Sequence, residues 1–348
     1  MKYRVVQWTT GNVGKRSVEA IVAHPDLELI GCYAWSADKV GRDVGELCGI
    51  APTGVLATND ADALIALGPD CVVYNPMLID VDEMVRILEA GVNIVSTTWF
   101  ITGHSLGEGR DRIIDACQRG GASVFGSGIN PGYSDMLAMA ATTICDRVDK
   151  VVVTEMADAT GYDSPATEMP LGFGRPIDDP NLPAMTRSGT GYFEDRVHLL
   201  GDALGIEFDE VALDVEYAKT TQDLDLGSWS IAAGCVAGMD YRWQGRIGGR
   251  TVVEFRSRLI KGQTLEPSWT LDHGFSIEIH GRPTVKARIE VGPPPDFRAT
   301  TAGEWMVLFM IATAMPAINA IPAVVAAPSG IVTYNDIPLP TAEGFVSR

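Results

Sequence analysis

Short apolar segments alternate with amphipathic helical segments along the first 150 residues. Apolar runs at 3–8, 27–33, 70–74, 93–96 and 122–125 are expected to form strands. Between them, a segment after a Gly-containing turn and residues 60–67, 81–90 and 108–119 have helical periodicity. Apolar strands separated by helices of this length predict a parallel sheet that is covered on both faces. In such sheets, ligands bind beyond the carboxyl ends of the strands.

The pattern changes after residue 150. Apolar and polar positions alternate within 251–260, 275–279 and 285–291, and residues 245–249 and 280–283 are typical of hairpin turns. This alternation indicates an antiparallel sheet with one covered face. Residues 169–190 are rich in Pro and Gly and are expected to form a long loop.

These patterns predict an α/β protein with a Rossmann-type, doubly wound parallel sheet and a second α+β domain built on an antiparallel sheet. The parallel sheet is expected to occupy residues 1–150. The α+β domain is expected to occupy residues 151–304, and we assign it substrate binding and oligomerisation. Residues 305–348 are expected to form a C-terminal helix and tail that packs back on the first domain.

Composition narrows the class of partner. The chain has 348 residues, of which 46% are hydrophobic, and a mean hydropathy of +0.10, so it can bury a large core. Its net charge of −18 argues against nucleic acid or an anionic membrane as a partner. One apolar run, 305–327, is long enough to span a membrane, but it contains Pro316, Asn319 and Pro322. We expect a buried helix and loop there.

The six cysteines are scattered, without a C-x-x-C pair or a His at zinc-site spacing. They are expected to be reduced, buried thiols of a cytoplasmic protein, and no metal site is expected. The first residues run directly into a strand and show no export signal, which also favours the cytoplasm.

The turn after the first strand has the features of a phosphate-binding loop. Gly11 and Gly14 occupy the second and third glycine positions of the G-x-G-x-x-G dinucleotide fingerprint, and Thr9 stands at the first. In that fingerprint, the second glycine lets the backbone approach the pyrophosphate, and the helix N-terminus faces the phosphates. The predicted cofactor-binding residues of this turn are Thr9, Thr10, Gly11, Asn12, Val13 and Gly14.

The end of the second strand favours NADP. NAD-binding domains usually place an acidic residue there, whereas this chain has Ser36 followed by Lys39 and Arg42, which suit a 2′-phosphate. Residues 1–45 carry six basic and five acidic side chains, a net charge of +1, while the other 303 residues carry −19. NAD stays open as the alternative cofactor. Asn75 and Pro76, which follow another strand, are expected to line the ribose.

These residues resemble a known family. The segments TTGNVGK and SADKVGRDVGEL are similar to the dihydrodipicolinate reductase-like proteins. GSGINPG at 126–132 and NAIP at 319–322 resemble the branch that contains 2,4-diaminopentanoate dehydrogenase and the native amine dehydrogenases. The resemblance implies an NAD(P)-dependent oxidoreductase acting on a small molecule, and a homodimer formed through the second sheet. It also places Thr97, Asn130 and Asn319 at the cofactor site.

The chain departs from its relatives at two points. It lacks the H-H-x-x-K and D-A-P-S-G-T segments of the lysine-pathway reductases, so that reaction is not expected. Amine-forming members carry a carboxylate just after a Ser-Thr pair at a strand end, where this chain has Trp99 and Phe100. The step that activates ammonia is therefore in doubt, but hydride transfer is not affected.

Hydride transfer needs a group that supplies or removes a proton near the acceptor carbon. His104, Glu108 and Tyr162 are the catalytic candidates, although each alone is more often a structural polar residue. The predicted function is NADP-dependent hydride transfer to or from a C=O or C=N group of a small, fairly hydrophobic substrate. Two alternatives stay open: an amine dehydrogenase with a relocated carboxylate, and a catalytically silent nucleotide-binding regulator.

Overall fold

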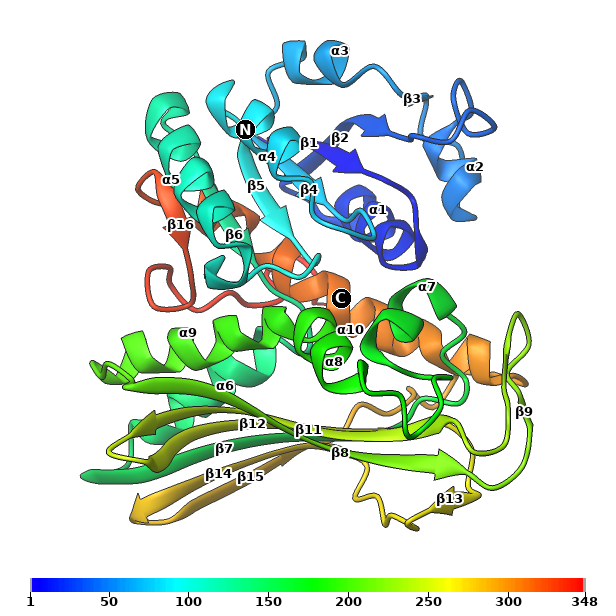
Figure 1. Ribbon diagram of the computed structural model, residues 1–348. Helices are drawn as coiled ribbons and strands as arrows, with labels where there is room; N and C mark the ends of the chain where they lie inside the picture. Colours follow the sequence, from blue (N-terminus) through cyan, green and yellow to red (C-terminus); the bar gives the residue numbers. More distant parts are fainter. Residues whose placement is uncertain (1, 347–348) are drawn as a thin grey trace. The chain divides into compact units, whose positions relative to one another are not determined.

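A computed structural model describes residues 2–346 of the chain (Figure 1). The chain forms two compact units. Unit 1 comprises the residues up to 133 together with those from 309 onward, and unit 2 comprises residues 134–308. The boundary falls before the predicted residue 150 because helix α6 (Tyr133–Thr142) contributes Leu137, Ala138 and Met139 to the core of unit 2.

Unit 1 contains a seven-stranded sheet in which all neighbouring strands are parallel. Across the sheet the strands are β16 (Gly330–Val332), β6 (Ser123–Gly126), β5 (Asn93–Ser96), β4 (Cys71–Tyr74), β1 (Tyr3–Trp8), β2 (Leu27–Tyr33) and β3 (Ala57–Thr58). The order reverses between β1 and β4, so the carboxyl ends of these two strands mark the usual ligand-binding edge.

Helices cover both faces of this sheet. On one face, Val6, Val72 and Ile94 pack against α4 (Val81–Glu89) and α5 (Glu108–Gly120). On the other face, alternate strand residues such as Val5 and Val73 pack against α1 (Asn12–Ala23) and α10 (Ala302–Val325). Short helices α2 (Val44–Cys48) and α3 (Ala61–Ala66) and the 3₁₀ turn η1 (His104–Leu106) complete the unit. The predicted doubly wound architecture is confirmed.

Helix α10 replaces the predicted helix and loop with one continuous helix that contains Pro316 and Pro322. By length and composition alone, residues 303–325 could cross a membrane. The later turns, however, belong to the core of unit 1, where Ile318, Ile321 and Val324 are fully buried. Core packing therefore accounts for the apolar character of the later turns of this helix.

Unit 2 contains a second seven-stranded sheet. Its strands, in spatial order, are β13 (Leu265–Glu266), β8 (Glu210–Thr220), β11 (Val236–Ile247), β12 (Arg250–Ile260), β7 (Arg147–Asp158), β14 (Gly274–Arg282) and β15 (Val285–Ile289). The sheet is mixed rather than purely antiparallel, because β7 and β12 run parallel. The predicted turn between β11 and β12 is present, with Gly248 and Gly249 both at positive φ, as a tight hairpin turn requires.

One face of this sheet is covered by helical segments of unit 2. They are α6, α7 (Pro165–Glu168), η2 (Met169–Leu171), α8 (Leu182–Gly189), η3 (Gly191–Phe193) and α9 (Glu194–Leu204). The small hairpin of β9 (Leu224–Asp225) and β10 (Ser230–Ile231) lies in the same unit. The segment predicted as a loop, 169–190, is partly helical, because it contains η2 and α8. Helix α8 has Pro183 in its first turn, where the missing N–H of proline is tolerated.

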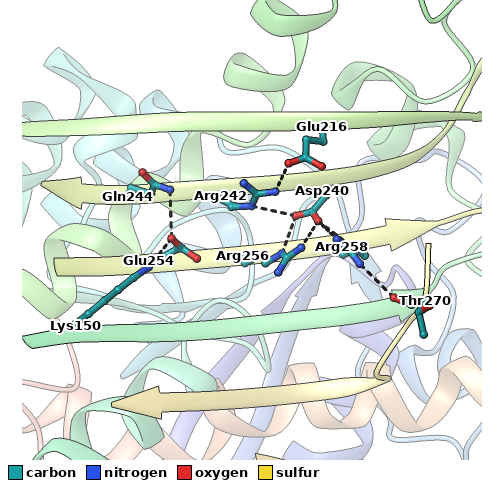
Figure 2. Close-up of polar contacts among 9 residues, drawn as sticks. All are labelled: Lys150, Glu216, Asp240, Arg242, Gln244, Glu254, Arg256, Arg258 and Thr270. Atoms are coloured by element: carbon teal, nitrogen blue, oxygen red, sulfur yellow. Dashed lines mark hydrogen bonds and ion pairs between the residues drawn. The ribbon is translucent and has the colours of Figure 1, made fainter. Parts of the chain in front are cut away.

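The opposite face carries a network of charged side chains (Figure 2). Asp240 is fully buried there and accepts hydrogen bonds from Arg256, at 2.9 and 2.5 Å, and from Arg258, at 2.7 Å. Burial alone would raise the pKa of Asp240, but these two guanidinium groups hold it below its ordinary value. Arg242 bridges Asp240 and Glu216 across neighbouring strands.

Candidate functional site

The turn after β1 has an unusual backbone conformation at one residue of the predicted phosphate-binding loop. Thr9 has φ +72°, in the left-handed region that favours glycine, at the position of the first fingerprint glycine. A hydrogen bond of 2.8 Å from its hydroxyl to the Asn75 carbonyl holds this unusual conformation. Thr9 therefore has a backbone angle that favours glycine at the position where the fingerprint has its first glycine.

The two glycines of the turn face different constraints. A Cβ at Gly14 would lie 2.5 Å from the Thr9 carbonyl oxygen, so only glycine lets α1 pack this close to the loop. A Cβ at Gly11 would meet nothing within 4 Å. Gly11 is also the N-cap of α1, with no side-chain cap and no acidic residue in the first helical turn among the described residues. The open space and the N–H groups beside it fit a phosphate group.

A chain of hydrogen bonds connects the carboxyl ends of three adjacent strands. The buried Gln7 amide on β1 donates to the Thr9 carbonyl, at 2.9 Å, and to Asn75 Oδ1, at 2.8 Å. Asn75, after β4, donates to the Thr97 hydroxyl, after β5, at 2.6 Å. The Pro76 carbonyl accepts from Thr98. Asn75 and Thr97 are thus brought together, and Gln7, which sequence reasoning missed because it lies inside the strand, fixes their position.

The loop after β2 presents the predicted 2′-phosphate residues. Lys39 Nζ donates to the Thr10 hydroxyl at 3.2 Å, which connects this loop to the phosphate-binding turn. Arg42 is exposed, and Trp35 is 75% exposed. The Ser36 hydroxyl bonds to the Asp38 carboxylate, a contact that the sequence did not predict. The loop therefore carries two cations and one carboxylate.

The segment after β5 packs closely against the end of β6. Trp99 has φ +27°, and Phe100 is buried, with its carbonyl so close to Gly126 that no side chain would fit there. Asn130 is half-buried in a turn closed by a hydrogen bond of 2.9 Å from the Gly128 N–H to the Pro131 carbonyl. Phe100 is consequently part of the core of unit 1.

Asn319, on α10, has a buried side-chain oxygen that accepts no hydrogen bond from residues 2–346. A buried carbonyl oxygen without a donor is costly, and a cofactor amide could supply the donor. This oxygen, together with the open space at Gly11, indicates that the residues present fit a dinucleotide.

The three catalytic candidates do not form one cluster within either unit. His104, in η1, contacts the Thr102 hydroxyl through Nδ1 at 2.8 Å, and Glu108 is exposed in the first turn of α5. Both lie in unit 1, whereas Tyr162 lies in unit 2, in the loop after β7.

The Tyr162 loop is anchored by a buried ion pair that the sequence did not reveal. Lys261 is fully buried and donates to the carbonyls of Ala159 and Tyr162, each at 2.8 Å, and pairs with Glu168 at 2.6 Å. Burial raises the pKa of the Glu168 carboxyl to about 7, although Lys261 opposes this shift. Burial likewise lowers the pKa of Lys261.

Cysteine chemistry is not prominent in the described part of the chain. All six cysteines are unpaired. Burial raises the pKa of Cys32 to about 12 and those of Cys48 and Cys117 to about 11, which disfavours the reactive thiolate. The described residues also contain no group of three or more His, Cys, Asp or Glu side chains that could hold a metal ion.

Comparisons with known proteins agree with this geometry. A profile of the 2,4-diaminopentanoate dehydrogenase C-terminal domain matches residues 133–345. An amine dehydrogenase of Streptomyces virginiae is 30% identical, over 99% of this chain and 98% of its own length. This chain belongs to the 2,4-diaminopentanoate dehydrogenase family. The family comprises pyridine-nucleotide dehydrogenases, so the chain is an NAD(P)-dependent oxidoreductase, as the resemblance implied.

Two further matches extend this result. A 2,4-diaminopentanoate dehydrogenase of Acetoanaerobium sticklandii is 24% identical over 75% of this chain and 70% of its own length. The structure of an amine dehydrogenase from Mycobacterium smegmatis superimposes with a TM-score of 0.79 at 20% identity, over 99% of this chain and 98% of that one. The second match shows a shared fold.

Proposed function

We propose that this protein is an NADP-dependent oxidoreductase that transfers a hydride between nicotinamide and a C=O or C=N group of a small, fairly hydrophobic substrate. The observation that carries the proposal is the phosphate-binding turn, where Thr9 keeps a glycine-like conformation and Gly11 faces open space before a helix N-terminus. When bound, the nicotinamide supplies or accepts the hydride.

Each part of the nucleotide has residues that would hold it. The turn from Thr9 to Gly14 would bind the pyrophosphate through backbone N–H groups and the helix dipole. Asn75, Pro76 and Thr97 would line the ribose beside the nicotinamide. The orphaned Asn319 oxygen and the Asn130 side chain would orient the carboxamide. Trp35, exposed in the loop after β2, would stack on the adenine.

The choice of NADP over NAD rests on Lys39 and Arg42. Two cations near a 2′-phosphate give charge-assisted contacts that a ribose hydroxyl cannot match. Asp38, bound to Ser36, is the group that would favour NAD instead. Fluorescence titration should show NADPH binding at least tenfold more tightly than NADH, and Lys39→Ala with Arg42→Ala should lower NADPH affinity more than NADH affinity and so remove that preference. Equal affinities in the wild type would refute the choice of NADP, and binding of neither nucleotide would refute the proposed function.

Amine dehydrogenase activity is the second candidate, because a relative that is 30% identical over nearly the whole chain carries that name. The activity would need a carboxylate to replace the one missing at Trp99 and Phe100. Glu108, exposed in the first turn of α5, is the carboxylate that follows this segment along the chain.

We also propose that the protein acts in the cytoplasm as a homodimer that binds neither nucleic acid nor membrane. Six unpaired cysteines suit a reducing compartment. A net charge of −18 disfavours polyanions as partners. The charged face of the unit 2 sheet, with both signs of charge in one layer, suits contact with a second copy of itself.

A further inference from the structure

The side-chain amide of Gln7 is held in one orientation. Gln7 is fully buried on β1, and a Cβ at Gly14 would lie only 3.2 Å from Gln7 Nε2, so α1 lies close to this amide. The Thr9 carbonyl oxygen, 2.9 Å from the same atom, can only accept a hydrogen bond. The Gln7 atom that faces Thr9 must therefore be the nitrogen. The Gln7 oxygen accepts no hydrogen bond within residues 2–346.

This orientation fixes the direction of the two hydrogen bonds that follow. The Gln7 nitrogen also donates to Asn75, at 2.8 Å, so the Asn75 atom in that bond must be the oxygen. The Asn75 nitrogen then faces the Thr97 hydroxyl at 2.6 Å, and Thr97 must accept. A hydroxyl that accepts one bond can still donate its own proton, so the chain of hydrogen bonds ends at a donor.

The Thr97 proton is not used within the described part of the protein. Thr97 is half-buried just after β5, and its hydroxyl donates to no acceptor within residues 2–346. Its neighbour Thr98 differs in this respect, because the Thr98 hydroxyl donates to the Pro76 carbonyl at 2.7 Å. The Thr97 hydroxyl is therefore suited to a ligand that carries an acceptor oxygen.

The place of Thr97 in the sheet indicates which part of the nucleotide it would meet. In a dinucleotide-binding sheet, the phosphate turn follows the first strand and the adenosine half lies on the side of the second strand. Strands β4 and β5 lie on the other side of β1, so Thr97 belongs to the half that takes the nicotinamide and its ribose. The oxygen of a ribose hydroxyl accepts hydrogen bonds.

We propose that Gln7 is a positioning residue: through Asn75, it directs the Thr97 hydroxyl to donate to a hydroxyl oxygen of the nicotinamide ribose. Without Gln7, the Asn75 side chain would be able to turn round and accept from Thr97, and the proton would then be used inside the protein. The inference rests on the proposed function, to which it adds the residue that aligns the nicotinamide ribose. The same amide holds the Thr9 carbonyl, so one buried side chain serves both the phosphate turn and the nicotinamide half.

The test compares two nucleotides that differ by the nicotinamide half. NADPH has both halves, whereas adenosine 2′,5′-bisphosphate has only the adenosine half. Dissociation constants of both are measured by calorimetry on the full-length protein, and their ratio, the NADPH preference, reports what the nicotinamide half contributes. Thr97→Val should weaken NADPH binding about fivefold, as expected for one lost hydrogen bond, and leave the bisphosphate within twofold of wild type. Thr97→Ser keeps the hydroxyl and should leave both within twofold.

A double-mutant cycle separates positioning from a structural role. Gln7→Met keeps the length of the side chain but removes its donors, so it should lower the NADPH preference about as far as Thr97→Val does. Any loosening of the phosphate turn weakens both nucleotides and cancels in the ratio. In a protein that already carries Thr97→Val, Gln7→Met should change the preference by less than twofold, because the donor that it directs is gone.

The matched control is Thr58→Val. Thr58 lies on the edge strand β3 of the same sheet, and its hydroxyl accepts from the Asp60 N–H at 3.1 Å. This variant loses a threonine hydroxyl that is used inside the protein and should keep the wild-type NADPH preference. Thermal unfolding of every variant reports whether the fold is intact.

The outcomes separate this inference from the proposed function. Loss of the NADPH preference in Thr97→Val and in Gln7→Met, with no further loss in the double variant, supports the inference. A normal preference in Thr97→Val overturns the assignment of the donor. A normal preference in Gln7→Met, or an equal loss from Gln7→Met with and without Thr97→Val, overturns the positioning role. Each of these results leaves the oxidoreductase proposal standing, whereas failure of the wild type to bind any nicotinamide nucleotide overturns the proposed function itself.

Discussion

Thr9 shows how one residue can keep a backbone conformation that its side chain disfavours. Left-handed backbone angles disfavour a residue with a Cβ by about 1–2 kcal/mol, and branching at Cβ adds to the crowding. Here the Thr9 hydroxyl bonds to Asn75 and the Thr9 carbonyl accepts from Gln7, so two hydrogen bonds offset that penalty. The strained residue lies at the edge where the nucleotide is expected, as strained residues in functional sites often do.

Gly11 and Gly14 should respond differently to the same substitution. Gly14→Ala places a Cβ against the Thr9 carbonyl and is expected to lower the free energy of unfolding by about 1–3 kcal/mol. Gly11→Ala has room for its Cβ and should change that free energy by less than about 1 kcal/mol. It should nevertheless weaken NADPH binding at least tenfold, because the added methyl group occupies the space proposed for the pyrophosphate. Urea unfolding and NADPH titration of both variants check this pair, and a Gly11→Ala variant with normal NADPH affinity would contradict the assignment.

At the scale of elements, the strength of the sequence pattern decided what could be predicted. Strands β1, β2 and β5 have the predicted bounds, because each is an apolar run between turn residues. The edge strands β3 and β16 have only two and three residues, too few to show alternation. The parallel pairing of β7 with β12 joins strands far apart in the chain, which local periodicity does not report.

The residues of the candidate site also differ in whether the sequence could predict them. The glycines of the phosphate-binding turn could be predicted, since their spacing is local and has a known physical reason. Gln7 could not, because it lies inside a strand and acquires its role from a partner that follows another strand. Lys261 was missed for a related reason: its three partners are all roughly a hundred residues earlier in the chain.

The connection from β7 to α7 should depend on the Lys261–Glu168 pair. Lys261→Met is expected to lower the free energy of unfolding by about 3–5 kcal/mol at pH 8, because it leaves a buried carboxylate without its cation. The pKa of Glu168 is already raised to about 7, and loss of Lys261 raises it further. A carboxyl whose pKa is higher in the folded state binds more protons when folded, so its stabilising contribution is lost as the pH rises. Lys261→Met should therefore lower the free energy of unfolding less at pH 5 than at pH 8.

Urea unfolding at both pH values measures this difference. The double variant Lys261→Met with Glu168→Gln has no buried carboxyl at this place, so the pH-dependent part of the loss should disappear. An equal loss for Lys261→Met at pH 5 and pH 8 would show that Glu168 is not the group responsible.

At the scale of the whole molecule, the proposed homodimer predicts a mass of twice 37.3 kDa by light scattering at micromolar concentration. Thr154 lies on β7 opposite Arg256, on the charged face, so Thr154→Trp adds bulk there without removing a charge. This variant should be monomeric and folded. Ala66→Trp, at an exposed position of α3 in unit 1, is the control and should stay dimeric. A monomeric wild type would disprove the dimer.

The last prediction concerns the reaction: the protein should be a poor amine dehydrogenase with free ammonia. Reductive amination needs a group that takes protons from ammonia and stabilises a cationic iminium, which a carboxylate in a low-dielectric site does well. Trp99 and Phe100 accept no proton, and Phe100 is buried in the core. With cyclohexanone and NADPH, excess ammonium should therefore raise NADPH oxidation by less than twofold, in the wild type and in Glu108→Gln alike. Abundant amine formation that Glu108→Gln abolishes would instead restore the amine dehydrogenase assignment, with Glu108 as the base.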